Sequence, residues 1–237
     1  MAKRLLLISN STNYGEDYLA YTKPFIKEFL GPESLEALFI PYAGVSVTYD
    51  DYTEKVSKVF NELGYSIKSI HNTKDPVKAV EDAKCIVVGG GNTFHLFHML
   101  HINKLVEPMT KKVNDGVPFI GWSAGSNVAC PSLKTTNDMP IVQPVSFDGL
   151  SLIPFQINPH YTETIIPNHA GESREQRIRE FLVVNPETTV VGLKEGSILQ
   201  VEGDNVKILG GKTLKVFRKD EPALELDSKA SLDFLMK

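Results

Sequence analysis

The first 130 residues alternate short apolar runs with amphipathic segments, and this alternation limits the fold more than any other feature of the sequence. The apolar runs predict strands, and the amphipathic segments predict helices. The expected strands are 4–10, 36–43, 65–71, 84–91 and 117–123, and the expected helices are 18–31, 48–64, 74–83 and one or two within 92–116. Strands that alternate with helices form right-handed β-α-β units, which build a mostly parallel sheet with helices on both faces. We therefore expect an α/β fold whose ligands bind beyond the carboxyl ends of the strands.

The pattern changes after residue 130. Residues 131–149 predict a long irregular connection, which is either a binding loop or a disordered one. A helix is expected at 173–186, and short alternating runs with glycine turns follow it. These runs predict a β-rich C-terminal part, mostly antiparallel, that packs on the same sheet or on its edge. Because neither a repeat nor a convincing linker divides the chain, we expect a single domain over residues 1–237.

The composition excludes several classes of protein. Hydrophobic residues make up 42% and charged residues 23%, which is ordinary for a soluble globular chain. The net charge is −4 and no segment concentrates Lys and Arg, so we expect no nucleic-acid partner. No window approaches the ~18 apolar residues of a membrane helix, and the apolar run after Arg4 is too short for a signal peptide. We therefore expect a cytoplasmic protein without a membrane partner, and the sequence leaves monomer and homodimer open.

Residues 121–125, GWSAG, match the G-x-S-x-G pattern of a nucleophile elbow. In this turn a serine stands between a strand and a helix, and glycines are needed because neighbouring side chains would collide. The turn exposes the Ser123 hydroxyl and directs the N–H of Ala124 at the same point, where an oxyanion would develop. A plain tight turn is the alternative. The buried run before the motif and the helix-compatible run after it favour Ser123 as a nucleophile.

A second glycine turn, GGGNT at 89–93, follows the expected strand 84–91. It lacks the spacing of the G-x-G-x-x-G motif and the Gly-Lys-Ser/Thr ending of a phosphate loop. Because it lies at the same sheet edge as Ser123, the N–H of Gly91 is a candidate second oxyanion donor. The alternative is a tight turn between strand and helix.

A serine hydroxyl is a poor nucleophile unless a base takes its proton. Of the six histidines, His160 follows the apolar run FQINP and so lies at an expected strand end, on the ligand edge. His169 is its nearest competitor. His95, His98 and His101 share a helical spacing, but no carboxylate or cysteine completes a metal-ligand set nearby, so we expect no metal.

The two cysteines, Cys85 and Cys130, lie in apolar surroundings. We interpret both as small core residues rather than as a disulfide or a metal pair.

A carboxylate should orient the histidine. Glu195 follows an apolar run and precedes a glycine, which places it at an expected strand end, although a turn carboxylate in a hairpin has the same signature. Asp138 in the irregular segment is another candidate, and further candidates downstream include Glu172, Glu175 and Glu187. The order Ser–His–Glu along the chain differs from the Ser–acid–His order of α/β-hydrolases.

Five segments resemble the peptidase E family, the α-aspartyl dipeptidases among the serine peptidases, over essentially the full length. They are GGGNTF, GWSAGSNVA, INPHY, GESREQRIREFLVV and GLKEGS, and they occur in the family's order and spacing. The resemblance implies a flavodoxin-like fold similar to the class I glutamine amidotransferases. It implies Ser123 as nucleophile, His160 as general base, Glu195 as the third member, and Gly91 and Ala124 as oxyanion donors. The implied activity removes the N-terminal aspartate from Asp-X dipeptides with a free α-amine, without a cofactor.

The same resemblance assigns Arg174 to the carboxylate of the substrate's aspartyl side chain. A guanidinium suits that task because it offers two parallel donors to a carboxylate. The residues alone favour a solvated surface pair instead, and they leave Arg177 and Arg179 equally eligible. Asn92, beside the glycine turn, is a candidate contact for the substrate amine.

Two alternative functions stay open at this point. One is a related hydrolase of other acidic peptides, such as the aspartyl-arginine polymer that cyanophycinases cut. The other is a protein that binds an acidic metabolite without catalysis. The presence of Ser123, His160 and Glu195 weighs against the second.

Overall fold

A computed structural model describes residues 2–164, 168 and 170–237. The strands are β1 Arg4–Ile8, β2 Glu36–Ile40, β3 Ser66–Ser69, β4 Ile86–Val88, β5 Phe119–Trp122, β6 Gln156–Tyr161, β7 Val190–Lys194, β8 Ile198–Glu202, β9 Asn205–Leu209, β10 Leu214–Phe217 and β11 Leu224–Leu226. The α-helices are α1 Lys23–Leu30, α2 Tyr49–Glu62, α3 Pro76–Asp82, α4 Thr93–Ile102, α5 Val106–Asn114, α6 Ala124–Val128 and α7 Arg174–Val184. Short 3-10 helices are η1 Ala20–Thr22, η2 Ile70–Asn72 and η3 Asp233–Met236.

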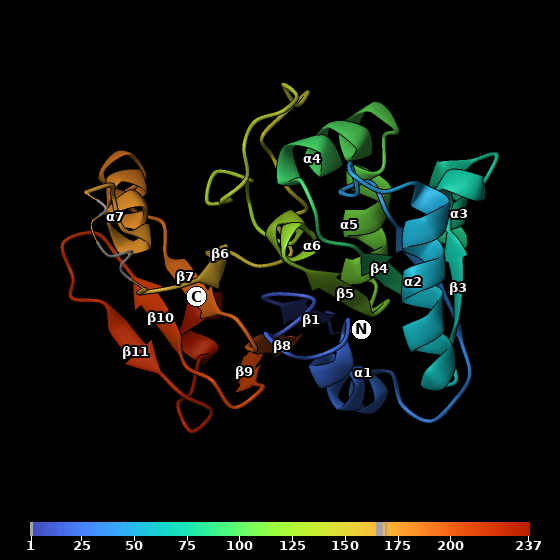
Figure 1. The fold of residues 1–237 in the computed structure, drawn as a ribbon, viewed down its shortest axis with the longest axis horizontal. Helices are drawn as coiled ribbons and strands as arrows, with labels where there is room; N and C mark the ends of the chain where they lie inside the picture. The colour runs from blue at the N-terminus through green and yellow to red at the C-terminus, as the bar shows by residue number, and fades with distance from the viewer. Residues whose placement is uncertain (1, 165–167, 169) are drawn as a thin grey trace.

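Seven strands form the larger sheet, in the order β3-β2-β4-β5-β1-β8-β9 (Figure 1). The first five are parallel, and β8 and β9 extend the sheet as an antiparallel hairpin beside β1. The expected mostly parallel α/β sheet is therefore confirmed. The order β3-β2-β4-β5 is the flavodoxin-like arrangement, with β1 in the place that follows β5.

Helices cover both faces of this sheet. Successive residues of a strand point to opposite sides, so a strand can pack against helices on both faces. Leu5 and Leu7 of β1 belong to an apolar cluster with residues of α3, α4 and α5. Leu6 and Ile8 belong to a second cluster with residues of α1 and α2. The strands β1, β2, β4 and β5 are buried along most of their length for this reason, as parallel strands between two helical layers are.

Helix boundaries follow the local capping signals. The side chains of Thr48, Asp75 and Asn92 each accept a hydrogen bond from a backbone N–H in the first turn of α2, α3 and α4. The helix expected at 18–31 is shorter, because α1 begins with Pro24 in its first turn and a 3-10 turn precedes it. Of the helices in the described ranges, none has the length and apolar character needed to cross a membrane.

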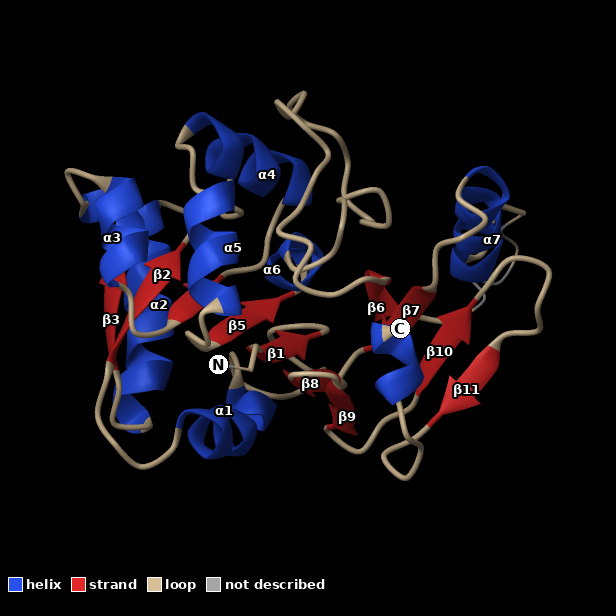
Figure 2. Cartoon of the chain, turned by 180° about the vertical axis from the view of Figure 1, so that it is seen from behind, coloured by secondary structure: helices blue, strands red, loops and turns tan. Residues whose placement is uncertain are grey.

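The C-terminal part forms two structures rather than one. The β8–β9 hairpin lies on the edge of the larger sheet, as expected. The other strands form a separate four-stranded sheet in the order β11-β10-β7-β6, which corrects the expectation of a single sheet (Figure 2). In this second sheet β6 and β7 are parallel, and α7 lies between them in the sequence. Residues of both sheets share one apolar cluster, so the two sheets pack against a common core.

The topology places a crevice at one end of the larger sheet. From β2 the chain goes to β3 on one side, while β4 lies on the other side of β2. Where connections diverge in this way, an opening forms beyond the carboxyl ends of the strands. The segments that follow β2, β4 and β5 meet there, namely 41–48, 89–92 and the turn at Ser123.

Candidate active site

Ser123 stands on a strained turn between β5 and α6. Its backbone has φ 53° and ψ −114°, a conformation that side-chain-bearing residues rarely adopt. The flanking glycines are sterically required: a Cβ on Gly121 would lie 2.3 Å from the carbonyl oxygen of Gly125, and a Cβ on Gly125 would lie 2.2 Å from that of Val88. The GWSAG pattern is therefore an elbow that turns too tightly to hold side chains beside the serine.

A chain of hydrogen bonds joins the three residues expected from the sequence. Nε2 of His160 lies 3.0 Å from Oγ of Ser123, and Nδ1 of His160 lies 2.7 Å from Oε1 of Glu195. His160 comes from the end of β6 and Glu195 follows β7, so the second sheet supplies both. Their side chains are 39% and 57% exposed, which leaves the imidazole open to an incoming ligand.

His160 is directed at Ser123 by an irregularity in β6. The pairing of β6 with β7 shifts register between Asn158 and Tyr161, and His160 within this interval has φ 53°. Such an irregularity re-aims a side chain relative to the regular strand. The position of His160 at a strand end was predictable, whereas its left-handed backbone was not.

Two polar residues at the end of β1 fix these backbone positions. Oγ of Ser9 accepts a hydrogen bond from the N–H of His160 at 2.9 Å and donates to the carbonyl of Leu193 at 2.7 Å. Oδ1 of Asn10 accepts from the N–H of Gly196 at 2.8 Å, directly after Glu195. Both side chains are buried. Neither residue was predicted from the sequence, where the available signal was a polar pair at the carboxyl end of a buried strand.

The expected oxyanion donors lie beside the serine. Gly91 has φ 139°, and a Cβ there would lie 2.1 Å from the carbonyl oxygen of Ala43, so the turn admits only glycine. Tyr52 donates from its hydroxyl to the carbonyl of Gly90 at 2.9 Å and thereby holds this turn against α2. Within the described chain, the N–H groups of Gly91 and Ala124 have no protein acceptor.

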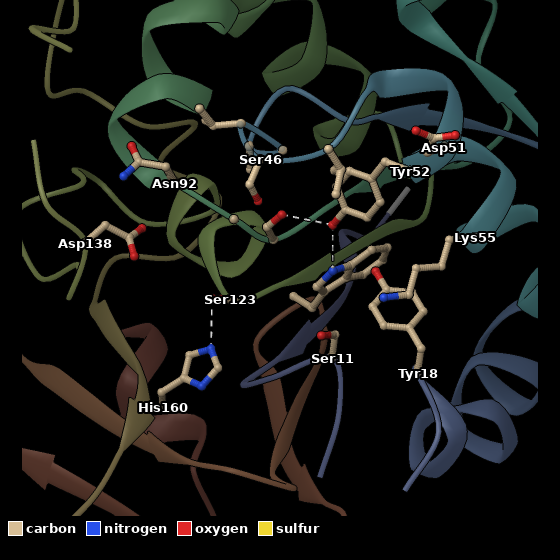
Figure 3. Close-up of a pocket in the computed structure, with 17 residues that line it drawn as sticks. Ser11, Tyr18, Ser46, Asp51, Tyr52, Lys55, Asn92, Ser123, Asp138 and His160 are labelled. Carbon is tan, nitrogen blue, oxygen red and sulfur yellow. Dashed lines mark hydrogen bonds between the residues drawn. The ribbon is translucent and has the colours of Figure 1, made fainter. Parts of the chain in front are cut away.

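An open cavity of about 750 Å³ contains this site (Figure 3). Its lining residues are Ser11, Tyr18, Ala43, Gly44, Val45, Ser46, Val47, Asp51, Tyr52, Lys55, Gly90, Gly91, Asn92, Trp122, Ser123, Asp138 and His160. They come from the segments that follow β1, β2, β4 and β5, from α2, from β6 and from the irregular segment 131–149. The volume suits a small ligand rather than a folded partner.

Asp138, the second acid candidate, does not contact His160 in the described structure. Its Oδ2 accepts from the N–H of Thr93 at 2.7 Å and from the hydroxyls of Thr93 and Thr136. It thus fastens segment 131–149 to the beginning of α4. Asn92 does the same, since its Oδ1 accepts from the N–H of His95 and its Nδ2 donates to the carbonyl of Met139. These hydrogen bonds fix the irregular segment beside α4, and Asp138 brings it to the cavity.

The three arginines of α7 have different partners. Arg177 pairs with Glu172, and Arg179 pairs with Glu175. Arg174 has no carboxylate partner among the described residues. Its guanidinium donates to Oδ1 of Asn137. Burial, and to a lesser extent Arg177, holds the pKa of Arg174 below its ordinary value.

Asn137 connects Arg174 to the neighbourhood of His160. The side chain of Asn137 donates to the carbonyl of Pro159 at 2.6 Å and accepts from Asn158 at 2.6 Å. Arg174 does not itself line the cavity that contains Ser123. Asp138, the residue after Asn137, does line it.

Two of the other histidines bond backbone carbonyls. His95 bonds the carbonyl of Tyr42, and His101 bonds that of Asp148. Within the described ranges, no group of three or more His, Cys, Asp or Glu side chains is arranged to hold a metal ion. His169, the competitor of His160, lies outside the described residues. Cys85 and Cys130 are free and buried, which confirms their interpretation as core residues.

A serine on a strained turn, bonded to an imidazole that bonds a carboxylate, is the arrangement of hydrolases that act through an activated hydroxyl. Here it lies at the carboxyl edge of an open parallel sheet, beside a cavity of small-molecule size.

Comparison with known proteins agrees with this class. The family model described as Peptidase family S51 matches residues 5–209. Peptidase E of Nostoc sp. (strain PCC 7120) is 53% identical over 237 residues, which cover 100% of this chain and 98% of the relative. Peptidase E of Shigella flexneri serotype 5b is 50% identical over 225 residues, 94% of this chain and 97% of the relative. The chain therefore belongs to peptidase family S51, and its enzyme class is peptidase.

A solved structure supports the fold independently. The crystal structure of a peptidase from an acI-B1 Actinobacterium superposes with a TM-score of 0.72. The superposition covers 98% of this chain and 97% of the Actinobacterium chain, and the two sequences are 20% identical. The shared architecture thus persists where most residues differ.

Proposed function

We propose that this protein is a serine exopeptidase that removes the N-terminal aspartate from Asp-X dipeptides through an acyl-enzyme. The observation that carries the proposal is the hydrogen-bond chain from Ser123 through His160 to Glu195, at 3.0 and 2.7 Å, on the wall of an open cavity. Family membership supports peptide hydrolysis as the reaction.

In the proposed mechanism His160 takes the proton of the Ser123 hydroxyl through Nε2, and Oγ attacks the aspartyl carbonyl carbon. The imidazolium then gives this proton to the leaving amine, and the C–N bond breaks. Water attacks the resulting ester with His160 again as base, which releases aspartate and restores Ser123. Glu195 accepts the hydrogen bond from Nδ1–H, so it keeps the proton off Nε2 in the resting state and stabilises the imidazolium.

The oxyanion of each tetrahedral intermediate would lie against the N–H groups of Gly91 and Ala124. Both are backbone donors on turns that sterics make rigid. Preorganised donors of this kind contribute about 2.7–4 kcal/mol each to the transition state. A rigid turn keeps that benefit because little reorganisation is needed when charge develops.

Selection of aspartate is assigned to Arg174. A half-buried guanidinium without a carboxylate partner in the described chain has lost part of its hydration, and a bound carboxylate would restore the lost interaction. The α-amine is assigned to the side of the cavity that contains Asn92 and the Asp138 carboxylate. A cation is favoured beside a carboxylate, which fits a requirement for a free amine.

We also propose one catalytic domain over 1–237, supported by the apolar cluster that both sheets share. The proposed steps use side chains and backbone groups of this chain alone. A cytoplasmic location and a monomeric or dimeric state stay predictions.

The test is the release of aspartate from Asp-Leu, measured beside Glu-Leu, Leu-Leu and N-acetyl-Asp-Leu, with wild type and Ser123→Ala. We expect cleavage of Asp-Leu alone, and loss of that activity in the variant. Because Ser123 is on the surface of a cavity, the variant should fold, and circular dichroism checks this.

The same assay separates the alternatives. Cleavage of the N-acetylated peptide would show that the amine is not recognised and would favour an endopeptidase such as a cyanophycinase-like enzyme. Folded wild type that cleaves none of the peptides would refute the dipeptidase and favour a binding protein.

A further inference from the structure

The peptide group between Pro159 and His160 is held by side chains at both of its polar atoms. Its N–H, that of His160, donates to Oγ of Ser9 at 2.9 Å. Its carbonyl, that of Pro159, accepts from Nδ2 of Asn137 at 2.6 Å. Ser9 follows β1, whereas Asn137 belongs to the irregular segment 131–149. This peptide group therefore cannot rotate without loss of a hydrogen bond to one or the other part of the chain.

The torsion that these contacts fix is the one that aims the imidazole. Rotation of the peptide group would change ψ of Pro159 and φ of His160 together, and φ of His160 is 53°. That value is unfavourable for a residue with a side chain, so it persists only where surrounding contacts hold it. Asn137 is one of the two side chains that supply such contacts at the proposed general base.

The other end of the Asn137 amide accepts two hydrogen bonds. Its Oδ1 accepts from the guanidinium of Arg174 and from Nδ2 of Asn158, the latter at 2.6 Å. Nδ2 of Asn158 also donates to the carbonyl of Thr135 at 2.8 Å, so its direction is fixed from β6. Because two donors meet Oδ1, the amide of Asn137 has one favourable orientation, with Nδ2 toward Pro159.

One planar amide thus joins the residue assigned to recognition and the residue assigned to proton transfer. A guanidinium has five N–H donors in a fixed fork, so Arg174 can keep one N–H on Asn137 and direct others at a carboxylate. The contact with Asn137 limits the directions that the long arginine side chain adopts. The backbone of His160 depends on the opposite end of the same amide.

We propose that Asn137 is a positioning residue with two roles. In the first role, its Nδ2 holds the backbone that aims His160 at Ser123. In the second role, its Oδ1 holds Arg174 in the direction from which it binds the aspartyl carboxylate. The second role rests on the proposed aspartyl peptidase function, whereas the first requires only that His160 is the base.

The experiment measures kcat and KM for Asp-Leu and Asn-Leu with wild type, Asn137→Ala and Asn137→Asp. Asn-Leu has the shape of Asp-Leu without the side-chain charge, so the ratio of the two kcat/KM values reports on Arg174. Asn137→Ala removes both ends of the amide. Asn137→Asp is nearly isosteric and keeps an acceptor for Arg174, but it lacks the donor to Pro159 and adds a carboxylate beside the guanidinium.

Asn185→Ala is the matched control. Asn185 lies at the opposite end of α7 from Arg174, and its Nδ2 donates to the carbonyl of Phe181 at 2.8 Å. The control therefore removes a hydrogen bond of the same kind, in the same part of the protein, without contact to His160. Thermal melting and circular dichroism show whether each variant is folded.

A second measurement follows the first role without any substrate. The imidazole resonances of His160 are recorded by nuclear magnetic resonance and assigned by their loss in His160→Gln. We expect them to shift or broaden in both Asn137 variants, because the ring is less well aimed at Ser123, and to stay unchanged in Asn185→Ala.

The kinetic expectations separate the two roles. Asn137→Ala should lower kcat for both peptides by about 10- to 100-fold, since small misplacements of a catalytic group are costly. It should also reduce the preference for Asp-Leu over Asn-Leu by about 10-fold, the effect of a weakened hydrogen bond between charged groups. Asn137→Asp should raise KM for Asp-Leu more than for Asn-Leu, because the new carboxylate neutralises Arg174 and repels that of the substrate. Asn185→Ala should match wild type.

The outcomes that would overturn each role differ from failure of the proposed function. Wild-type kcat and unchanged His160 resonances in folded Asn137→Asp would refute the first role. An unchanged preference for Asp-Leu in the same folded variant would refute the second role, and would leave an aspartyl peptidase. If folded wild type cleaves neither peptide, the proposed function and the second role fail together, and the His160 resonances still decide the first.

Discussion

The two sheets contribute to the candidate site by different physical means. The larger sheet supplies Ser123 and the N–H groups of Gly91 and Ala124, all on turns that admit no side chain at the critical positions. The second sheet supplies the side chains of His160 and Glu195, which are aligned by hydrogen bonds. One half is shaped by steric exclusion, and the other half is shaped by polar contacts.

Those polar contacts cross from one sheet to the other. Ser9 and Asn10, at the end of β1, hold the backbone at His160 and at Gly196. A typical hydrogen bond contributes about 1 kcal/mol, whereas forcing a Cβ to about 2.2 Å from a carbonyl oxygen would require the backbone to move. The comparison indicates that the histidine half of the site is easier to disturb without unfolding the protein.

The largest effect should follow from breaking the connection between the halves. Ser123→Ala and His160→Ala should each lower kcat for Asp-Leu by at least about 10⁴-fold, and the double variant should be little worse than either, because residues that act as a unit are not additive. The measurement is kcat for the two single variants and the double variant. Losses that multiply would show that the two residues act independently.

Replacement of Glu195 tests whether its carboxylate orients the imidazole of His160. Glu195→Gln keeps the size but replaces the carboxylate that accepts from Nδ1, so the imidazolium loses its stabilising charge and the tautomer is no longer fixed. We expect kcat to fall by about 10²- to 10⁴-fold. Glu187→Gln, an exposed glutamate in the turn before β7, is the control and should leave kcat unchanged. Similar rates for wild type and Glu195→Gln would remove Glu195 from the proposed mechanism.

Ser9 tests the contact between the sheets. Ser9→Ala removes the acceptor for the N–H of His160, so the left-handed backbone there is less well held and the imidazole is displaced. We expect kcat to fall by about 10- to 100-fold with little change in KM, since small misplacements of a catalytic group are costly.

Ser69→Ala is the matched control for Ser9→Ala. Ser69 is also buried and also bonds a histidine, His71, but it lies on β3, the outermost strand on the far side of the larger sheet from β8 and β9. A structural loss common to buried serines would lower thermal stability in both variants and would leave kcat intact in both. Equal kcat in Ser9→Ala and wild type would therefore contradict the positioning role.

The larger sheet was predictable from sequence because its determinants are local. Alternating apolar runs and amphipathic helices specify parallel strands, and the glycines around Ser123 specify a turn without reference to distant residues. The rule that ligands lie at carboxyl ends of strands then placed His160 and Glu195 on the correct edge. The side chains of Ser123, His160 and Glu195 are joined by hydrogen bonds in the structure.

The second sheet was not predictable in the same way. An alternating strand carries no information about which sheet it joins, so β10 and β11 could not be distinguished from β8 and β9. The roles of neighbouring arginines on α7 depend on partners far along the chain, such as Asn137 for Arg174. Likewise, nothing local distinguishes Ser9 from any other serine that follows a strand.

The smallest effect on activity is expected for reagents that attack thiols. This experiment tests how firmly the two halves of the site pack against each other. Cys130 follows α6, and its Sγ accepts from the N–H of Ile157 on β6 at 3.2 Å, so it lies between the helix that follows Ser123 and the strand that contains His160. Burial raises the pKa of both Cys130 and Cys85 to about 12, which leaves little reactive thiolate at neutral pH.

Iodoacetamide should therefore leave the activity of the native protein unchanged, and should modify both thiols once the protein is denatured. Mass spectrometry counts the modified thiols while the Asp-Leu assay follows activity. If activity instead falls in step with alkylation of Cys130 in the native protein, the two halves separate often enough to admit the reagent, and the boundary is looser than its hydrogen bonds imply.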